Sequence, residues 1–83
     1  MAVNYSHLRG LTARELLSAL ARDGFVLDRQ AGAHQLYLHA DGRRVTVSFH
    51  RPGEIFEIKT LRAMIELQAR WTNQDLKRLK LIR

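Results

Sequence analysis

The feature that most constrains the fold is residues 43–49, where apolar and polar side chains alternate strictly. One side of this segment has Val45, Val47 and Phe49, and the other side has Arg44, Thr46 and Ser48. An alternation with a period of two residues is typical of a β-strand with one buried face. The segment follows Asp41-Gly42, a pair that favours tight hairpin turns because both residues tolerate positive φ. Residues 34–49 therefore predict a β-hairpin.

A third strand is predicted just before this hairpin. Residues 25–30 are rich in large apolar side chains, and the small residues 31–33 then form a turn. In the next strand Leu36 and Leu38 alternate with Tyr37 and His39. We expect the leucines on the core side and Tyr37 on the outer face. By the same parity His34 lies on the leucine side, at the rim of the core.

Helices are predicted both before and after the three strands in the sequence. Thr12 and Glu15 form a capping box before an apolar stripe, and Gly24 ends that helix, which spans residues 13–23. Apolar residues at helical spacing predict a second helix from Ile58 to about residue 69, and a final short helix follows Thr72. The fold class is α+β: an α-β-β-β-α order, with helices on one face of a three-stranded antiparallel sheet and an extra C-terminal helix.

The totals limit the organisation of the chain. Its 83 residues make one small domain, and the absence of cysteine excludes disulfides and cysteine-based zinc sites. Residues 1–11 have no periodic pattern and are expected to be a flexible leader before a single domain at 12–83. No segment approaches the roughly 18 apolar residues that a membrane helix needs. We expect a cytoplasmic protein that has no membrane contact.

Positive charge is concentrated in two parts of the chain. The formal net charge is +6. Residues 29–51 have four arginines against Asp41, and residues 70–83 have five basic residues against Asp75. Such clusters are the electrostatic footprint of a polyanion-binding protein. A basic surface with no partner remains an equally good interpretation of charge alone.

Three histidines lie within residues 34–50, and His34 is the first candidate for chemistry. It follows Gly32 and Ala33, whose small side chains allow a phosphate to approach closely. An imidazole titrates near neutrality, so it can take a proton from a ribose 2′-hydroxyl. A structural or incidental histidine is the alternative. His39, His50 and His34 lack the spacing and the carboxylates of a metal site, so neither a metal nor a cofactor is expected.

The remaining candidates surround the hairpin. Arginine forks suit phosphates, and an aromatic ring can stack on an unpaired base. The predicted RNA-contacting residues are Arg29, Gly32, Ala33, Tyr37, Arg43, Arg44 and His50. A solvated outer face of a one-sided sheet is the alternative interpretation of the same residues.

Taken in order, several short pieces resemble the HicA (YcfA-like) family, the toxin half of a bacterial type II toxin–antitoxin pair. They are Thr12 to Leu17, Asp23-Gly24-Phe25, Arg29 to His34, Asp41 to Val47, His50, and Thr60-Leu61-Arg62. The resemblance implies a double-stranded-RNA-binding-like fold and a metal-independent endoribonuclease that cleaves messenger RNA. It also implies that His34 is the catalytic residue and that a HicB-like antitoxin covers the active site. We expect the free toxin to be a monomer.

The chain departs from the family pattern at three positions. Ala33 stands where serine is usual, Ser48 where proline is common, and Lys59 where glycine often precedes Thr60. Loss of the hydroxyl at position 33 predicts weaker phosphate positioning. Two other functions are therefore kept open: a non-catalytic RNA-binding module, and a partner-binding domain without nuclease activity.

Overall fold

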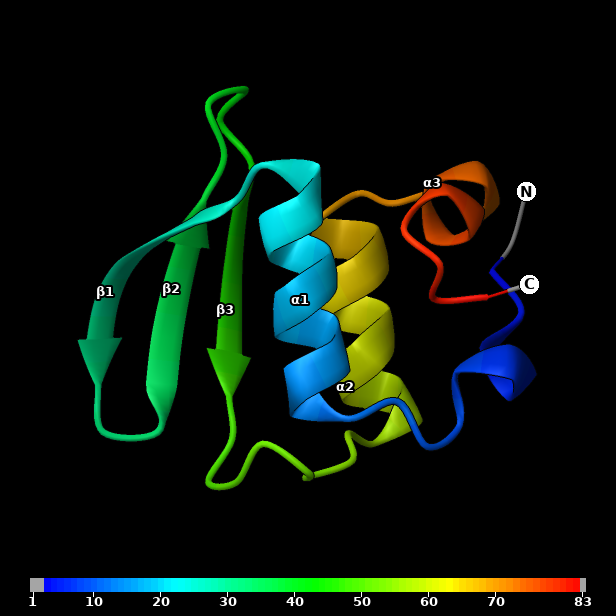
Figure 1. The fold of residues 1–83 in the computed structure, drawn as a ribbon, viewed down its shortest axis with the longest axis horizontal. Coiled ribbons are helices and arrows are strands. Elements are labelled where there is room, and N and C mark those ends of the chain that lie inside the picture. Colours follow the sequence, from blue (N-terminus) through cyan, green and yellow to red (C-terminus); the bar gives the residue numbers. More distant parts are fainter. Residues whose placement is uncertain (1–2, 83) are drawn as a thin grey trace.

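The computed structural model describes residues 3–82 and confirms the predicted α+β order (Figure 1). The elements, in chain order, are η1 (Tyr5–Leu8), α1 (Ala13–Asp23), β1 (Val26–Ala31), β2 (His34–Leu38), β3 (Arg44–Ser48), α2 (Ile58–Arg62), η2 (Ala63–Gln68) and α3 (Asn73–Arg78). Within the described residues no helix is long and apolar enough to cross a membrane.

The ends of α1 are formed as its sequence predicts. The Thr12 hydroxyl accepts a hydrogen bond from the Glu15 backbone N–H at 3.2 Å, and the Thr12 N–H donates to the Glu15 carboxylate at 3.0 Å. At the other end Gly24 adopts φ +102, a conformation that glycine reaches without a Cβ clash. Because both ends of α1 are fixed, the chain leaves the helix at a defined point and reaches β1 through Phe25.

The three strands form one antiparallel sheet in the order β1-β2-β3. The register of β1 against β2 shifts between Leu27 and Arg29, which leaves Asp28 as an extra residue in a β-bulge. The β2–β3 pairing is regular, with Gln35 opposite Val47 and Tyr37 opposite Val45. Figure 1 shows β1 farthest from the helices, in keeping with the exposure of all six of its residues.

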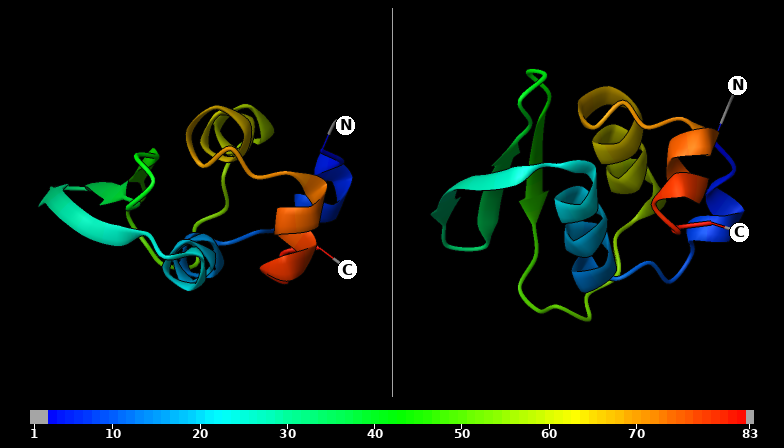
Figure 2. Two further views of the ribbon diagram at one scale, coloured as in Figure 1. Left: turned by 90° about the horizontal axis from the view of Figure 1, so that it is seen from above. Right: turned by 45° about the horizontal axis from the view of Figure 1, so that its top comes forward.

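α1 and the continuous helical segment made of α2 and η2 cover the same face of the sheet. The two views of Figure 2 show the other face uncovered. Val45 and Val47 of β3 are at most 1% exposed and define the inner face. They pack with the apolar stripe of α1 and with the second helical segment. The buried core residues are Tyr5, Leu8, Leu11, Ala13, Leu16, Ala19, Leu20, Phe25, Val45, Val47, Phe56, Leu61, Met64, Ile65, Ala69, Trp71, Leu76 and Leu79.

The second predicted helix is present, but half of it is π-helical. α2 continues directly into η2, where the Ala69 N–H donates to the Met64 carbonyl oxygen at 2.8 Å. The chain then reverses through Arg70, a non-glycine residue at φ +57. This reversal places Trp71, which is 3% exposed, over the core.

The expected flexible leader is not what the structure shows for residues 3–11. This segment contains η1, and its apolar residues Tyr5, Leu8 and Leu11 belong to the buried core. The Tyr5 hydroxyl donates to the Glu66 carboxylate of η2, and the Arg62 guanidinium lies 5.3 Å from the Tyr5 ring centre. Residues 3–11 are therefore part of the domain; residues 1 and 2 lie outside the described range.

Candidate functional site

His34 is positioned by the two-residue turn between β1 and β2. Ala31 pairs with His34, and Gly32 and Ala33 form the loop between them. Gly32 has φ +58, and the first residue of such a loop favours glycine because positive φ is needed there. An added Cβ at Gly32 would meet no atom within 4 Å. The glycine therefore serves the backbone, and the space beside it is open.

His34 is exposed and lies directly opposite Ser48 in the sheet. The Phe49 N–H donates to the Ala33 carbonyl oxygen at 3.1 Å, so the neighbouring pair is the hydrogen-bonded one. His34 and Ser48 then form a non-hydrogen-bonded pair, the arrangement in which opposite side chains lie closest. The residue opposite the imidazole thus has a hydroxyl. This residue, Ser48, was not among the predicted site residues.

The predicted inner and outer faces of β2 were assigned the wrong way round. His34 does share a face with Leu36 and Leu38, but that face is the outer one. The inner face is set by Val45 and Val47 of β3, whose partners are Tyr37 and Gln35. Alternation alone shows that two faces exist, and only the cross-strand register shows which one meets the helices.

The outer face presents three rows of side chains across the strands. The rows are Ala31, His34 and Ser48; Arg29, Leu36 and Thr46; and Val26, Leu38 and Arg44. Rows on one face are separated by about 7 Å, because they lie two residues apart along each strand. Arg29 is thus one row from His34, and Arg44 is two rows away. Both arginines are exposed, and neither forms an ion pair with another described residue.

Tyr37 lies on the inner face and not on the outer face as predicted. It is half-buried against the core, and its hydroxyl donates to Gln35 Oε1 at 2.5 Å. Burial raises the pKa of the Tyr37 hydroxyl. The ring is therefore not available to stack on a base at the outer face.

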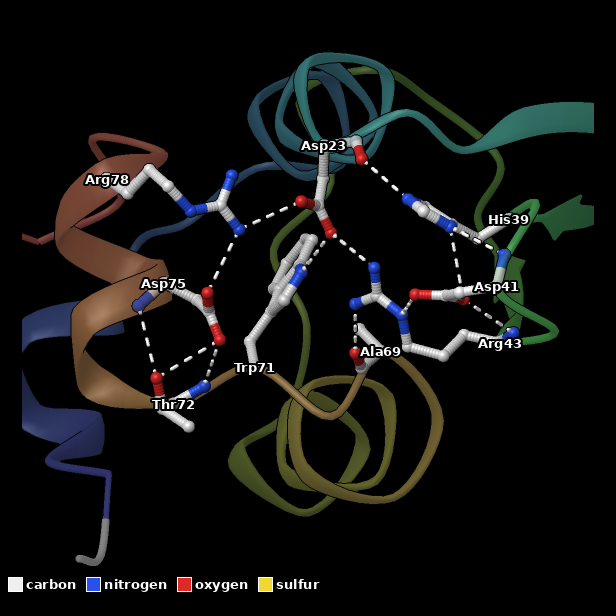
Figure 3. A network of polar contacts seen from close by, with 9 residues as sticks. All are labelled: Asp23, His39, Asp41, Arg43, Ala69, Trp71, Thr72, Asp75 and Arg78. Carbon is white, nitrogen blue, oxygen red and sulfur yellow. Dashed lines mark hydrogen bonds and ion pairs between the residues drawn. The ribbon is translucent and has the colours of Figure 1, made fainter.

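Arg43, expected to hold phosphate, is bound within the protein by a network of polar contacts (Figure 3). Its guanidinium lies 3.1 Å from Asp23 and 2.8 Å from Asp41, and it donates to the Ala69 carbonyl oxygen at 2.6 Å. The same group lies 4.9 Å from the ring centre of Phe25. With these partners, and a side chain only 17% exposed, Arg43 has a structural role.

Asp23 is the centre of this network. Its carboxylate, 7% exposed, also accepts hydrogen bonds from Trp71 Nε1 and from the Arg78 guanidinium, each at 2.8 Å. Burial by itself would raise the pKa of Asp23. The hydrogen bonds from Trp71 and Arg78, with the charges of Arg43 and Arg78, outweigh burial and lower the pKa below its usual value. The network ties α1 to the β2–β3 turn, η2 and α3.

His39 belongs to the same network. Its Nε2 lies 2.8 Å from the Asp23 carbonyl oxygen, and its Nδ1 lies 3.0 Å from the Asp41 carboxylate. The imidazole also packs edge-on against Phe25, with ring centres 5.0 Å apart. His39 therefore occupies a structural position at the opposite end of the sheet from His34.

A cavity of about 310 Å³ lies beside the β1–β2 turn, on the inner side of the hairpin. Its lining residues are Gln30, Gly32, Ala33, Gln35, Phe49 and His50. The structure thus brings together three predicted site residues, Gly32, Ala33 and His50. Two further residues, Gln30 and Gln35, were missed, although a two-residue hairpin loop implies that they pair across the strands.

Two further cavities in the described part of the chain have no histidine in their lining. One of about 340 Å³ lies between α1 and the end of α3, and its cations are Arg14, Arg22 and Lys80. Another, of about 480 Å³, follows β3 at residues 51–54. Among residues 3–82, no group of three or more His, Cys, Asp or Glu side chains could hold a metal ion.

The fold and this end of the hairpin define a small α+β domain that presents an exposed imidazole on an open, arginine-bearing sheet face. The sequence matches the family model described as "HicA toxin of bacterial toxin-antitoxin" over residues 13–70, more than half of the chain. The protein therefore belongs to the HicA toxin family of bacterial toxin–antitoxin systems, as the resemblance predicted. No curated protein matches the chain. Membership of this family implies an antitoxin partner.

Proposed function

We propose that the protein is an endoribonuclease toxin that cleaves messenger RNA, with His34 as its general acid–base residue. The observation that carries the proposal is the exposed imidazole of His34 on the open face of the sheet, in a chain of the HicA family. A messenger-RNA target makes the cytoplasm the place of action.

In the proposed reaction, His34 takes the proton of a ribose 2′-hydroxyl. The 2′-oxygen then attacks the adjacent phosphorus, the bond to the 5′-oxygen breaks, and that oxygen takes a proton from water. The products are a 2′,3′-cyclic phosphate and a free 5′-hydroxyl. An imidazole suits this role because it exchanges protons near neutral pH. The three outer-face rows include the His34 imidazole, so the chemistry they offer includes acid–base catalysis by that group.

Phosphate is held in this proposal by the outer-face arginines. Arg29 lies one row from His34 and Arg44 two rows, and both guanidiniums are free of ion pairs with the described residues. Guanidinium groups bind phosphate oxygens through paired N–H donors. Ser48, opposite His34, supplies a hydroxyl where Ala33 has none. Arg43 and Tyr37 are left out because their polar groups are bound inside the fold.

The test is RNA cleavage by the purified protein in the presence of a chelator. We expect cleavage that leaves 2′,3′-cyclic phosphate ends, and we expect His34→Ala to reduce its rate by about 10²–10⁴-fold. His7→Ala is the matched control, since His7 is an exposed histidine in η1. Equal cleavage by His34→Ala would refute the role of His34. A strict requirement for divalent ions would refute the mechanism.

The two other functions give different results in the same preparation. Salt-sensitive RNA binding without cleavage under any condition would indicate a non-catalytic RNA-binding module. Absence of RNA binding even at low salt would indicate a domain that only binds a protein partner.

The antitoxin in this proposal is a HicB-like acidic protein that covers the outer face. Leu36 and Leu38 of β2 lie on that face between Arg29 of β1 and Arg44 of β3, and Val26 of β1, which is 67% exposed, lies beside Leu38. An apolar patch flanked by cations suits a partner that has apolar and acidic groups. The product of an adjacent reading frame should bind and stop cleavage, and Val26→Asp should weaken that complex. Unchanged affinity of Val26→Asp would place the antitoxin elsewhere.

A further inference from the structure

The cavity beside the β1–β2 turn is lined by polar side chains that the proposed reaction does not use. Gln30 and Gln35 are a cross-strand pair on the inner face, and His50 follows the end of β3. His50 donates its backbone N–H to the Glu54 carboxylate at 3.0 Å, a bond that does not involve its ring. Within residues 3–82, neither the Gln30 amide nor the His50 imidazole has a hydrogen-bond partner in the protein.

Gln35 is held in one orientation. The Tyr37 hydroxyl, itself half-buried, donates to Gln35 Oε1 at 2.5 Å. The acceptor side of this amide is therefore engaged. Its NH₂ group keeps two donors that bind no other described residue. A pre-oriented amide at a cavity wall is suited to recognising a specific hydrogen-bonding edge.

The chemistry of the lining indicates a neutral ligand group. No arginine or lysine lines this cavity, whereas Arg29 and Arg44 lie on the other face of the hairpin. A phosphate would be expected among cations, while a nucleobase has donors and acceptors side by side along its edge. Glutamine amides pair with such edges, and an aromatic ring such as Phe49 can flank a base plane.

The position of the cavity relates it to His34. The cavity lies on the inner side of the turn, and His34 lies on the outer side between two lining residues, Ala33 and Gln35. Nothing occupies the space within 4 Å of a Cβ built at Gly32, so the end of the hairpin is open. A single RNA strand that bends around this end would have its backbone at His34 and one base in the cavity.

We propose that this cavity, lined by Gln30, Gln35, Phe49 and His50, is a nucleobase-binding pocket that selects the nucleotide next to the scissile bond. Its volume of about 310 Å³ is at the lower end of the range of about 300–1,000 Å³ found for ligand pockets. The inference rests on the proposed ribonuclease function, and it adds a determinant of RNA sequence preference to it.

The test measures binding, not cleavage. Wild-type protein is titrated with four 2′-O-methyl RNA trinucleotides that differ only in the central base, because such RNA lacks the 2′-hydroxyl needed for cleavage. We expect one base to bind at least about fivefold more tightly than the weakest, an energy difference of about 1 kcal/mol. Equal affinity for all four trinucleotides would overturn the pocket.

Variants then locate the preference. Gln35→Met and Gln30→Met keep the side-chain length and remove the amide, and the double variant should reduce the preference to less than about twofold. Gln74→Met, at an exposed glutamine of α3, is the matched control and should leave it unchanged. If Gln35→Met fails to fold, Gln30→Met alone decides, since Gln30 is exposed. A full preference in the folded variants would overturn the proposal. A clear base preference in a protein that cleaves no RNA would support the pocket while refuting the nuclease.

Discussion

The two ends of the sheet contain the same kinds of side chain and use them in opposite ways. At the β2–β3 turn, His39, Asp41 and Arg43 are bound to Asp23 and its neighbours, in what we call the Asp23 network (Figure 3). At the β1–β2 turn, which we call the His34 end, the imidazole of His34 and the guanidinium of Arg29 have no ion-pair partner among the described residues. The same types of side chain are thus engaged within the fold at one end and left without ion-pair partners among the described residues at the other.

Arg43 and Arg44 show this contrast at adjacent positions. Arg43 is half-buried and binds two carboxylates, while Arg44 is exposed on the outer face. Because neighbouring residues of a strand point to opposite faces, one arginine reaches the network and the other reaches solvent. The comparison therefore predicts that variants in the Asp23 network change stability and that variants on the outer face change function.

The largest expected effect on stability comes from Asp23→Ala. This change leaves Arg43 without the more buried of its two carboxylate partners and the Trp71 N–H without an acceptor. We expect a loss of about 3 kcal/mol, a large part of the roughly 4–12 kcal/mol that stabilises a domain of this length. Asp28→Ala, at an exposed carboxylate in the β1 bulge, is the control and should cost less than about 0.5 kcal/mol. Urea unfolding measures both, and equal losses would contradict the comparison.

Arg43 and Arg44 separate the Asp23 network from the outer face of the sheet at two adjacent positions. Arg43→Ala should cost about 2 kcal/mol of stability and leave RNA affinity unchanged, because its guanidinium is bound inside the fold. Arg44→Ala should leave stability within about 0.5 kcal/mol and lower RNA affinity, with a salt-dependence slope smaller by about 1. Thermal unfolding and RNA titration over a range of salt concentrations check the pair. A loss of stability in Arg44→Ala together with a loss of RNA affinity in Arg43→Ala would contradict this assignment of roles.

Acid should destabilise the protein through the Asp23 network. The pKa of Asp23 is lowered in the folded protein, so folding favours the ionised carboxylate. That contribution is complete above the unfolded pKa of about 3.9 and is lost as pH falls through the lower folded pKa. We expect the free energy of unfolding to fall below about pH 4, and to fall less in Asp23→Asn. Denaturant unfolding between about pH 2.5 and 6 measures this change. An identical pH dependence of the unfolding free energy in the wild type and in Asp23→Asn would exclude Asp23 as its source.

The smallest effect is expected at Arg70. This residue has φ +57, a conformation that costs about 1 kcal/mol for a residue with a Cβ. Arg70→Gly should raise stability by about 0.5–1 kcal/mol and leave RNA cleavage unchanged, because Arg70 lies beside the Asp23 network. Thermal unfolding provides the measurement. A loss of cleavage would mean that the two ends are not independent.

Local signals in the sequence predicted much of the fold. Thr12 with Glu15 forms the expected capping box, and Thr72 with Asp75 forms another at the start of the predicted final helix; in both, the partners lie within one helical turn. The Asp41-Gly42 turn and the three strands were predicted from alternation and turn chemistry. These features depend on near neighbours, so a single sequence is enough to reveal them.

What the sequence could not show depends on contacts between distant segments. Leu36 and Leu38 are more apolar than Gln35 and Tyr37, yet the register with Val45 and Val47 puts the leucines outside. Two of the partners of Arg43 are 20 or more residues away in sequence: Asp23 and Ala69. Residues 3–11 do contain a local signal, the three-residue spacing of the core residues Tyr5, Leu8 and Leu11.

The most direct test of the account compares two histidines of one hairpin. His34→Ala and His39→Ala are each measured for RNA cleavage per folded molecule and for melting temperature. We expect His34→Ala to lose cleavage by about 10²–10⁴-fold with an unchanged melting temperature. We expect His39→Ala to keep cleavage and to lose about 1–2 kcal/mol, because its imidazole binds Asp23 and packs on Phe25. Normal cleavage by His34→Ala, or loss of cleavage by a folded His39→Ala, would contradict the account.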